Sequence, residues 1–235
     1  MTKTALLFGS IGTVVESSDI QRTAYNQALQ EAGSPWRWDR ETYTELLSQS
    51  GGKERLAMLA SATGADFSVA EIEAIHSRKT ELAGEALLAA RPSPRPGVAA
   101  LIAHCKSHSI KVGFVTTTYR ANIDAIFAAV DGLSRDDFDY VGTRDDVEHG
   151  KPAPDAFLAA IEKLGVAAGD ALAIEDTAIS VMSAKRAGLV VVATPGELSV
   201  GQDLWQADLV LNDIADASGA IDPRLLALLA LPKPP

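Results

Sequence analysis

The chain contains one cysteine, Cys105, and its 21 basic side chains are outnumbered by 31 acidic ones. One cysteine excludes an intramolecular disulfide. The formal net charge of −10 argues against a nucleic acid or an anionic membrane as partner, because phosphate groups require a basic surface. No apolar run approaches the ~20 residues of a membrane-spanning helix. The segment Met1–Phe8 is too short and too weakly basic for a signal peptide. We therefore expect a cytoplasmic protein that binds neither nucleic acid nor membrane.

The composition is that of a globular protein, because 47% of the 235 residues are apolar and 22% are charged. Short apolar runs bounded by turn residues alternate with segments of helical periodicity. Runs of this kind are typical of parallel strands that are buried on both faces. They are Ala5–Phe8, Ile110–Val115, Ala171–Ile174, Val190–Ala193 and Ala207–Leu211. The alternation predicts an α/β fold with a Rossmann-like, doubly wound parallel sheet.

One long segment, residues 17–90, interrupts this alternation with helical patterns only. It includes the amphipathic stretch Ile20–Ala32 and a capping box formed by Ser68 and Glu71. The segment ends at Arg91–Gly97, where three prolines forbid a continuous helix. We therefore predict an α-helical cap domain, residues 16–92, inserted into a core made of residues 1–15 and 93–235.

Polar residues with an affinity for phosphate follow the second strand and precede a later helix. In an open α/β sheet, ligands bind beyond the carboxyl ends of the strands. Thr116 and Thr117 stand at such an end, where hydroxyls and free N–H groups form a phosphate cradle. Pro152 holds Lys151 on an extended segment, from which the ammonium can pair with phosphate. Taken singly, the threonines also fit a strand end with satisfied turn hydrogen bonds, and Lys151 fits a solvated surface lysine.

Two adjacent carboxylates, Glu175 and Asp176, follow the buried run Ala171–Ile174. Burying such a pair is costly unless it meets a cation, and carboxylates are common Mg²⁺ ligands. Capping of the helix that begins near Ile179 is the alternative role for Asp176. Because all these residues share one edge of the sheet, we predict that they form a joint phosphate and metal site.

The combination resembles the haloacid dehalogenase-like phosphohydrolases and, within them, the CbbY-like and β-phosphoglucomutase-like sugar phosphatases. The segments Trp36–Asp39 and Gly51–Arg55 are close to that group's cap pattern, and the resemblance extends from the first strand to about Leu211. It implies a mobile helical cap over a core with four loop motifs. The residue roles that it implies are phosphate binding by Thr116, Thr117 and Lys151, magnesium binding by Glu175 and Asp176, and contact with a distal phosphate by the cap residues Lys53 and Arg55.

The first motif departs from this pattern. The family carries Asp-x-Asp-Gly-Thr after the first strand, and this chain reads Gly9-Ser10-Ile11-Gly12-Thr13. Gly9 replaces the nucleophile and Ile11 replaces the general acid and base, and neither has a side chain capable of that chemistry. Ile11 keeps a backbone carbonyl for the metal, but one anionic ligand is lost. We therefore expect Mg²⁺ to bind more weakly than in the family.

Nearby residues do not supply a replacement nucleophile. Neighbouring side chains at a strand end tend to alternate, so we predict that the Ser10 hydroxyl faces away from the site. Ser18 and Gln21 stand where this group usually has a glutamate and a histidine that meet the substrate sugar. Both departures indicate a site that has lost its ancestral chemistry.

Three hypotheses follow. The first is a protein that binds a small phosphorylated metabolite of the sugar phosphate class with impaired turnover, in a pocket made more favourable to anions because Lys151 lacks its anionic neighbour. The second is an active Mg²⁺-dependent sugar-phosphate phosphatase that uses an altered mechanism. The third, ranked last because the chain carries no partner motif, is a protein-interaction module.

Overall fold

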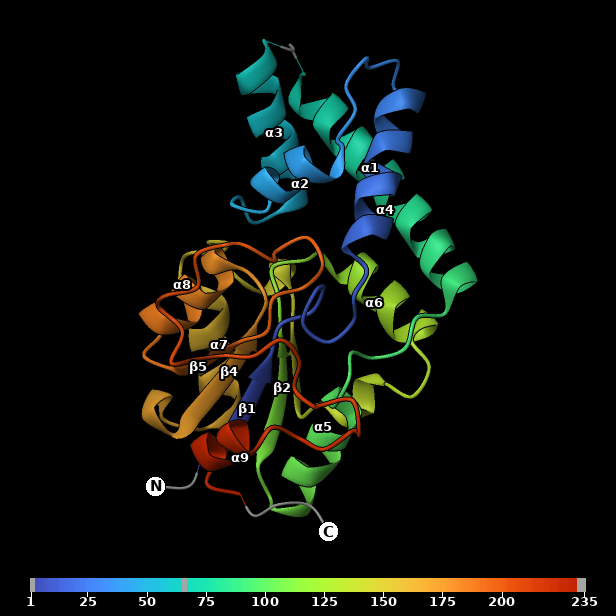
Figure 1. Cartoon of the computed structure of the whole chain (residues 1–235). Helices are drawn as coiled ribbons and strands as arrows, with labels where there is room; N and C mark the ends of the chain where they lie inside the picture. Colours follow the sequence, from blue (N-terminus) through green and yellow to red (C-terminus); the bar gives the residue numbers. More distant parts are fainter. Residues whose placement is uncertain (1–2, 65–66, 232–235) are drawn as a thin grey trace.

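The computed structural model describes residues 3–64 and 67–231, and a six-stranded parallel sheet lies in its lower part, below the helices α1–α4 in Figure 1. The strand order is β3-β2-β1-β4-β5-β6, and every neighbouring pair is parallel. The strands are β1 Ala5–Phe8, β2 Lys111–Val115, β3 Tyr140–Gly142, β4 Ala171–Glu175, β5 Val190–Ala193 and β6 Leu209–Val210. The predicted doubly wound α/β fold is confirmed, and β1 lies in the middle of the sheet between β2 and β4.

Helices cover both faces of the sheet because successive residues of β1 point to opposite sides. Leu6 and Phe8 pack in one hydrophobic cluster with α5, α6 and α9, whereas Ala5 and Leu7 pack in another with α7 and α8. The helices of the core are α5 Val98–Ser107, α6 Arg120–Ala129, α7 Asp155–Leu164, α8 Ala178–Arg186 and α9 Pro223–Leu229. Three short 3-10 turns accompany them, η1 Arg135–Asp137, η2 Arg144–Asp146 and η3 Ala168–Asp170.

In the described residues between β1 and α5 the helices are joined by loops and have their own hydrophobic cluster. These helices are α1 Ser18–Glu31, α2 Arg40–Leu46, α3 Gly52–Thr63 and α4 Val69–Ala90. Tyr25, Trp38 and Leu56 are buried in this cluster, where the Tyr25 and Trp38 rings lie 4.7 Å apart. The predicted capping box of Ser68 and Glu71 is present at the start of α4. The domain boundaries at residues 16 and 92 stay predictions, and residues 1, 2, 65, 66 and 232–235 lie outside the described parts of the chain.

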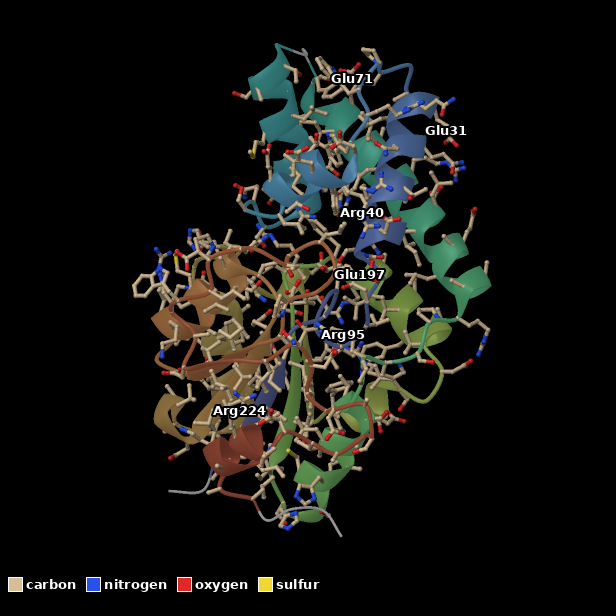
Figure 2. The ribbon with its side chains drawn as sticks, in the orientation of Figure 1. Glu31, Arg40, Glu71, Arg95, Glu197 and Arg224 are labelled. Carbon is tan, nitrogen blue, oxygen red and sulfur yellow. The ribbon has the colours of Figure 1, made fainter. Side chains whose placement is uncertain are left out.

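The linker that leads from the cap back to the sheet is fixed by Arg95. Its guanidinium donates to the carbonyl oxygens of Gly12, Thr194, Pro195 and Asn212 and to the Asp213 carboxylate. This one side chain therefore ties the linker to the loop after β1 and to the loops after β5 and β6 (Figure 2). Farther out, Arg40 of α2 and Glu197 form an ion pair at 3.2 Å between cap and core.

No helix within residues 3–64 and 67–231 is long and apolar enough to span a membrane.

Candidate functional site

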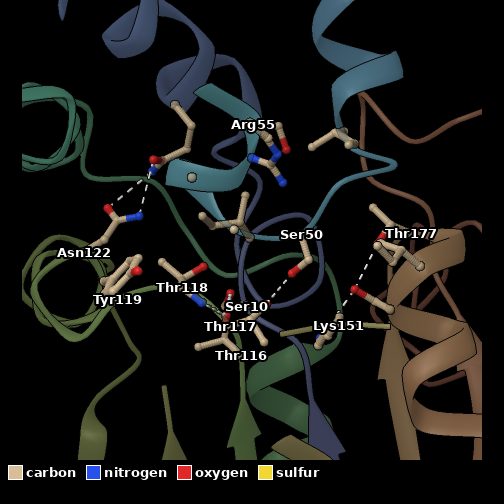
Figure 3. A pocket seen from close by; sticks show the side chains of 18 of the residues that line it. Ser10, Ser50, Arg55, Thr116, Thr117, Thr118, Tyr119, Asn122, Lys151 and Thr177 are labelled. Carbon is tan, nitrogen blue, oxygen red and sulfur yellow. Dashed lines mark hydrogen bonds between the residues drawn. The ribbon is translucent and has the colours of Figure 1, made fainter. Parts of the chain in front are cut away.

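A pocket lies at the carboxyl ends of the central strands, beneath the cap. Ser50 and Arg55 enter it from the cap, whereas Thr116, Thr117 and Lys151 enter it from the sheet (Figure 3). This is the edge at which ligands bind in open α/β sheets. The pocket is therefore shared by the two parts of the chain. We call the part lined by Thr116, Lys151 and Glu175 the sheet end, and the part lined by Arg55 and Lys79 the cap end.

Gly9, the position at which the resemblance predicts a nucleophile, follows directly after β1. Its N–H donates to the Ile174 carbonyl at 2.9 Å, which continues the pairing of β1 with β4. A Cβ atom at Gly9 would collide with the Glu175 carboxylate and would lie 2.8 Å from the Thr13 hydroxyl. The space that an aspartate would enter is thus occupied by Glu175. Ile11 is half-buried and packs against the hydrophobic cluster that contains Phe8.

The prediction that Ser10 faces away from the site is wrong. Ser10 lines the pocket, and its hydroxyl lies 2.8 Å from that of Thr116. The alternation of side chains does not reach Ser10, because β1 ends at Phe8 and the backbone then turns, with the Val14 N–H donating to the Ser10 carbonyl at 2.8 Å.

The threonines after β2 lie in the pocket, and their hydroxyls have partners within the protein. The Thr116 hydroxyl also accepts from the Thr118 N–H at 3.0 Å. The Thr117 hydroxyl lies 2.6 Å from that of Ser50, so it joins the sheet to the cap. The hydrogen bond from Thr118 is a turn bond of the kind that the alternative reading of these threonines expects. A phosphate would exchange with these contacts, and phosphate binding by Thr116 and Thr117 stays a prediction.

Lys151 is buried, with 6% of its surface exposed, so it is not a solvated surface lysine. Its ammonium donates to the Glu175 carboxylate and lies 3.4 Å from the Ser180 hydroxyl. The expectation that Lys151 lacks an anionic neighbour is therefore wrong. The Glu175 carboxylate lies beside Gly9 and neutralises Lys151. The sheet end of the pocket consequently has no excess positive charge.

Asp176 lies beside this ion pair and is buried. Burial raises its pKa to about 7, and the neighbouring Glu175 carboxylate adds to the rise. Burial also raises the pKa of Glu175, against the opposing effect of Lys151. Asp176 does not cap α8, because Thr177 is the N-cap residue and the Ala178 N–H donates to the Gln202 side chain at 2.9 Å. The capping alternative for Asp176 is therefore wrong.

The donors predicted for magnesium are the Ile11 carbonyl, Glu175 and Asp176. Glu175 is committed to Lys151, and the described residues contain no group of three or more His, Cys, Asp or Glu that could hold a metal. Mg²⁺ requires near-ideal octahedral oxygen coordination and gives up its water reluctantly. Outside the Lys151 ion pair, the predicted donors left for a magnesium ion are the Asp176 carboxylate and the Ile11 carbonyl.

The two predicted cap residues lie in different surroundings. Arg55 lines the pocket, and its Nε donates to the Gln49 carbonyl at 2.9 Å and to the Leu46 carbonyl at 3.2 Å. Lys53 points elsewhere: its ammonium pairs with Glu73 and lies 4.9 Å from the centre of the Tyr119 ring. The structure therefore places Arg55 in the pocket and Lys53 beside it.

A third basic residue of the cap, Lys79 of α4, lines the pocket and was missed by the sequence analysis. Its ammonium donates to the Gln21 carbonyl oxygen, which also accepts from the Asn122 amide at 3.3 Å. A signal for it exists in the sequence. Lys79 follows Ile75 by four residues and precedes Leu82 by three, so helical periodicity places it on the buried face of α4.

The sequence of this chain is similar to those of known proteins. The family model of haloacid dehalogenase-like hydrolases matches residues 4–188. Protein CbbY of Rhodobacter capsulatus is 37% identical over 222 residues, which cover 94% of this chain and 98% of that protein. Protein CbbY of Cereibacter sphaeroides is 35% identical over 227 residues, which cover 96% of this chain and 99% of that protein.

Solved structures show the same relationship. CbbY from Rhodobacter sphaeroides in complex with phosphate superposes with a TM-score of 0.85 at 34% identity, covering 92% of this chain and 98% of that one. A mutant of the same protein in complex with xylulose-(1,5)bisphosphate gives the same values. The chain therefore belongs to the haloacid dehalogenase-like hydrolases and, within them, to the CbbY-like group.

Proposed function

We propose that this protein binds a small phosphorylated metabolite of the sugar phosphate class and hydrolyses it inefficiently or not at all. One observation carries the proposal. At the end of β1, where the family places its nucleophile, Gly9 offers no side chain, and the adjoining space holds a Glu175 carboxylate that is paired with Lys151. Loss of a nucleophile typically reduces turnover by several orders of magnitude and leaves binding largely to other groups.

The rest of the pocket supports ligand binding. Hydroxyl groups of serine, threonine and tyrosine line it, together with the Gln21 and Asn122 amides and the Arg55 guanidinium. Such groups recognise the hydroxyls and phosphate of a sugar phosphate by hydrogen bonding. The CbbY of Rhodobacter sphaeroides, similar over 92% of this chain, binds phosphate and xylulose-(1,5)bisphosphate in its solved structures. In the proposed complex Thr116, Thr117, Lys151 and Arg55 contact the ligand.

Weak magnesium binding is part of the proposal. An aspartate at position 9 would supply a further carboxylate and would compete with Glu175 for Lys151. Without it, Asp176 and the Ile11 carbonyl are the donors that remain outside the Lys151 ion pair. We therefore expect ligand affinity to depend little on added Mg²⁺.

The experiment measures hydrolysis and binding in parallel. Release of phosphate from p-nitrophenyl phosphate and from xylulose 1,5-bisphosphate is followed with Mg²⁺ for the native chain and for the double variant Gly9→Asp, Ile11→Asp. The variant Gly9→Asn, Ile11→Asp is the matched control, because it fills the same space without a nucleophile. We expect the first double variant to exceed the native chain by at least about a thousandfold and the control to stay inactive.

Calorimetry on the native chain completes the test. We expect xylulose 1,5-bisphosphate or inorganic phosphate to bind, with or without Mg²⁺. Turnover by the native chain equal to that of the restored variant would contradict the proposed loss of catalysis, and absence of binding at millimolar ligand would contradict the proposed binding function.

A further inference from the structure

Lys79 of α4 is a buried amine without a counter-charge in the described parts of the chain. Its side chain is 5% exposed and lines the pocket. The Nζ atom donates to the Gln21 side-chain carbonyl and lies 4.7 Å from the centre of the Tyr25 ring. Neither contact carries a full negative charge. Lys151, which is equally buried, differs because its ammonium is paired with Glu175.

These surroundings favour the uncharged amine. Burial removes the water that stabilises an ammonium ion, and the nearby Arg55 guanidinium repels a second positive charge. Together they lower the pKa of Lys79 to about 7, with burial as the larger cause. A lysine that is desolvated and placed near another cation keeps its lone pair at neutral pH and becomes a nucleophile.

Two residues of α1, Gln21 and Tyr25, position the Lys79 amine. Gln21 of α1 accepts from Lys79 and also from Asn122 of α6, so the acceptor is held between the cap and the core. Tyr25, one turn further along α1, covers the amine with its ring. Arg55 lines the same pocket and provides a permanent positive charge for a phosphate.

We propose that Lys79 forms an imine with the carbonyl carbon of a phosphorylated aldehyde or ketone bound in this pocket. In this step the nitrogen lone pair forms the carbon–nitrogen bond and the carbonyl oxygen leaves as water with both amine hydrogens. The products are the imine and one water molecule, and no oxidant or reductant takes part. The inference rests on the proposed function, and it narrows the ligand class from sugar phosphates in general to those with an open-chain carbonyl.

Trapping tests the step. The native chain is incubated with dihydroxyacetone phosphate and sodium cyanoborohydride, which reduces an imine to a stable amine, and the modified lysines are identified by peptide mass spectrometry. We expect Lys79 to be modified at least about tenfold faster than any other lysine. Excess glycerol 3-phosphate, which has the phosphate and lacks the carbonyl, should protect it. Modification spread evenly over surface lysines, or unaffected by glycerol 3-phosphate, would overturn the inference.

Variants separate this chemistry from the binding function. Lys79→Arg keeps a positive charge and lacks a nucleophilic amine, so it should lose the trapped adduct. Lys53→Arg is the control and should keep it, because Lys53 pairs with Glu73 beside the pocket. If calorimetry shows that glycerol 3-phosphate binds the native chain while Lys79 is not trapped, the imine is refuted and the binding function stands. If neither of these compounds binds at millimolar concentration, and xylulose 1,5-bisphosphate and inorganic phosphate do not bind either, both proposals fail.

Discussion

The two ends of the pocket each contain a buried lysine, and they differ in what surrounds it. Lys151 at the sheet end is 6% exposed and is paired with Glu175, whereas Lys79 at the cap end is 5% exposed and meets an amide oxygen and an aromatic ring. The two lysines are thus buried to nearly the same extent but differ in the charge of the groups that they contact. The first lysine has a counter-charge, whereas the second, the proposed nucleophile, has none within residues 3–64 and 67–231.

The comparison also explains the charge of the pocket. The negative charge at the sheet end comes from Glu175 and Asp176, and Lys151 neutralises one of the two. At the cap end Arg55 and Lys79 line the pocket together. The sheet end is therefore not strongly positive, because Lys151 is paired with Glu175.

The largest effect is expected from breaking the pair at the sheet end. Glu175→Gln removes the carboxylate that pairs with the buried Lys151 and leaves Asp176 as its remaining acidic neighbour, which should lower the free energy of unfolding by about 3 kcal/mol. Urea denaturation followed by circular dichroism measures it. The double variant Glu175→Gln, Lys151→Met removes both charges and should recover most of the loss. An unchanged unfolding midpoint in the single variant would show that the pair is not buried as described.

At the cap end we expect the opposite result: replacing the buried Lys79 should raise the free energy of unfolding. Because the pKa of Lys79 falls from 10.5 to about 7 on folding, the unfolded chain holds more protons than the folded chain between these values. The free energy of unfolding should therefore rise with pH from 7 to 9, with Lys79 contributing up to about 1.4 kcal/mol per pH unit. Lys79→Met should remove this contribution and stabilise the protein at pH 7.

Two neighbouring groups, His76 and Tyr25, do not contribute to the change in unfolding free energy between pH 7 and 9. The pKa of His76 is lowered to about 3, mainly by burial, and that of Tyr25 is raised, so neither group titrates between pH 7 and 9. Lys53→Met is the control and should keep the native slope. Parallel pH profiles for Lys79→Met and the native chain would refute the uncompensated burial of Lys79.

A smaller effect tests the contact that joins the two ends. The Ser50 and Thr117 hydroxyls lie 2.6 Å apart, and both residues are buried. Ser50→Ala leaves the Thr117 hydroxyl without this partner, and we expect a loss of about 1 kcal/mol in the free energy of unfolding. Ser48→Ala, at an exposed position in the same segment, should change it very little. Equal effects of the two substitutions in urea denaturation would contradict a specific link between cap and sheet.

The smallest effect concerns Lys53. Its pair with Glu73 is largely exposed, with 27% and 54% of the two side chains accessible. Exposed pairs contribute little because water and salt screen them, so Lys53→Gln should cost less than about 0.5 kcal/mol in thermal or urea unfolding. It should also weaken phosphate binding less than Arg55→Gln does in calorimetry. A larger effect of Lys53→Gln on binding would place Lys53 at the cap end of the pocket.

The short, uninterrupted apolar runs made most of the sheet predictable. Ala5–Phe8 and Val190–Ala193 coincide with β1 and β5, because a strand buried on both faces requires consecutive apolar residues. Strand β3, Tyr140–Gly142, was not predicted, since it is three residues long and ends in glycine. The strand expected over Ala207–Leu211 is reduced to Leu209–Val210 at the edge of the sheet.

The sequence identified several residues of the pocket, but it did not predict which of them form hydrogen bonds or ion pairs with one another. Strand ends and motif order identified Thr116, Lys151, Glu175 and Asp176, all of which line the pocket. The pair of Lys151 with Glu175 depends on side-chain directions across 24 residues of sequence, which no local pattern carries. The contact of Lys79 with Gln21, 58 residues apart, requires the packing of α4 against α1.

Arg95 bears on how the protein reaches its native state. Its partners at Gly12, Thr194 and Asp213 are 83, 99 and 118 residues away in sequence. Contacts between such distant segments are costly to form, because closing the intervening loops costs entropy. They also raise the mean sequence separation of contacting residues, which in small proteins goes with slower folding. The loops around the pocket are thus held together by contacts that no single segment of the chain can make alone.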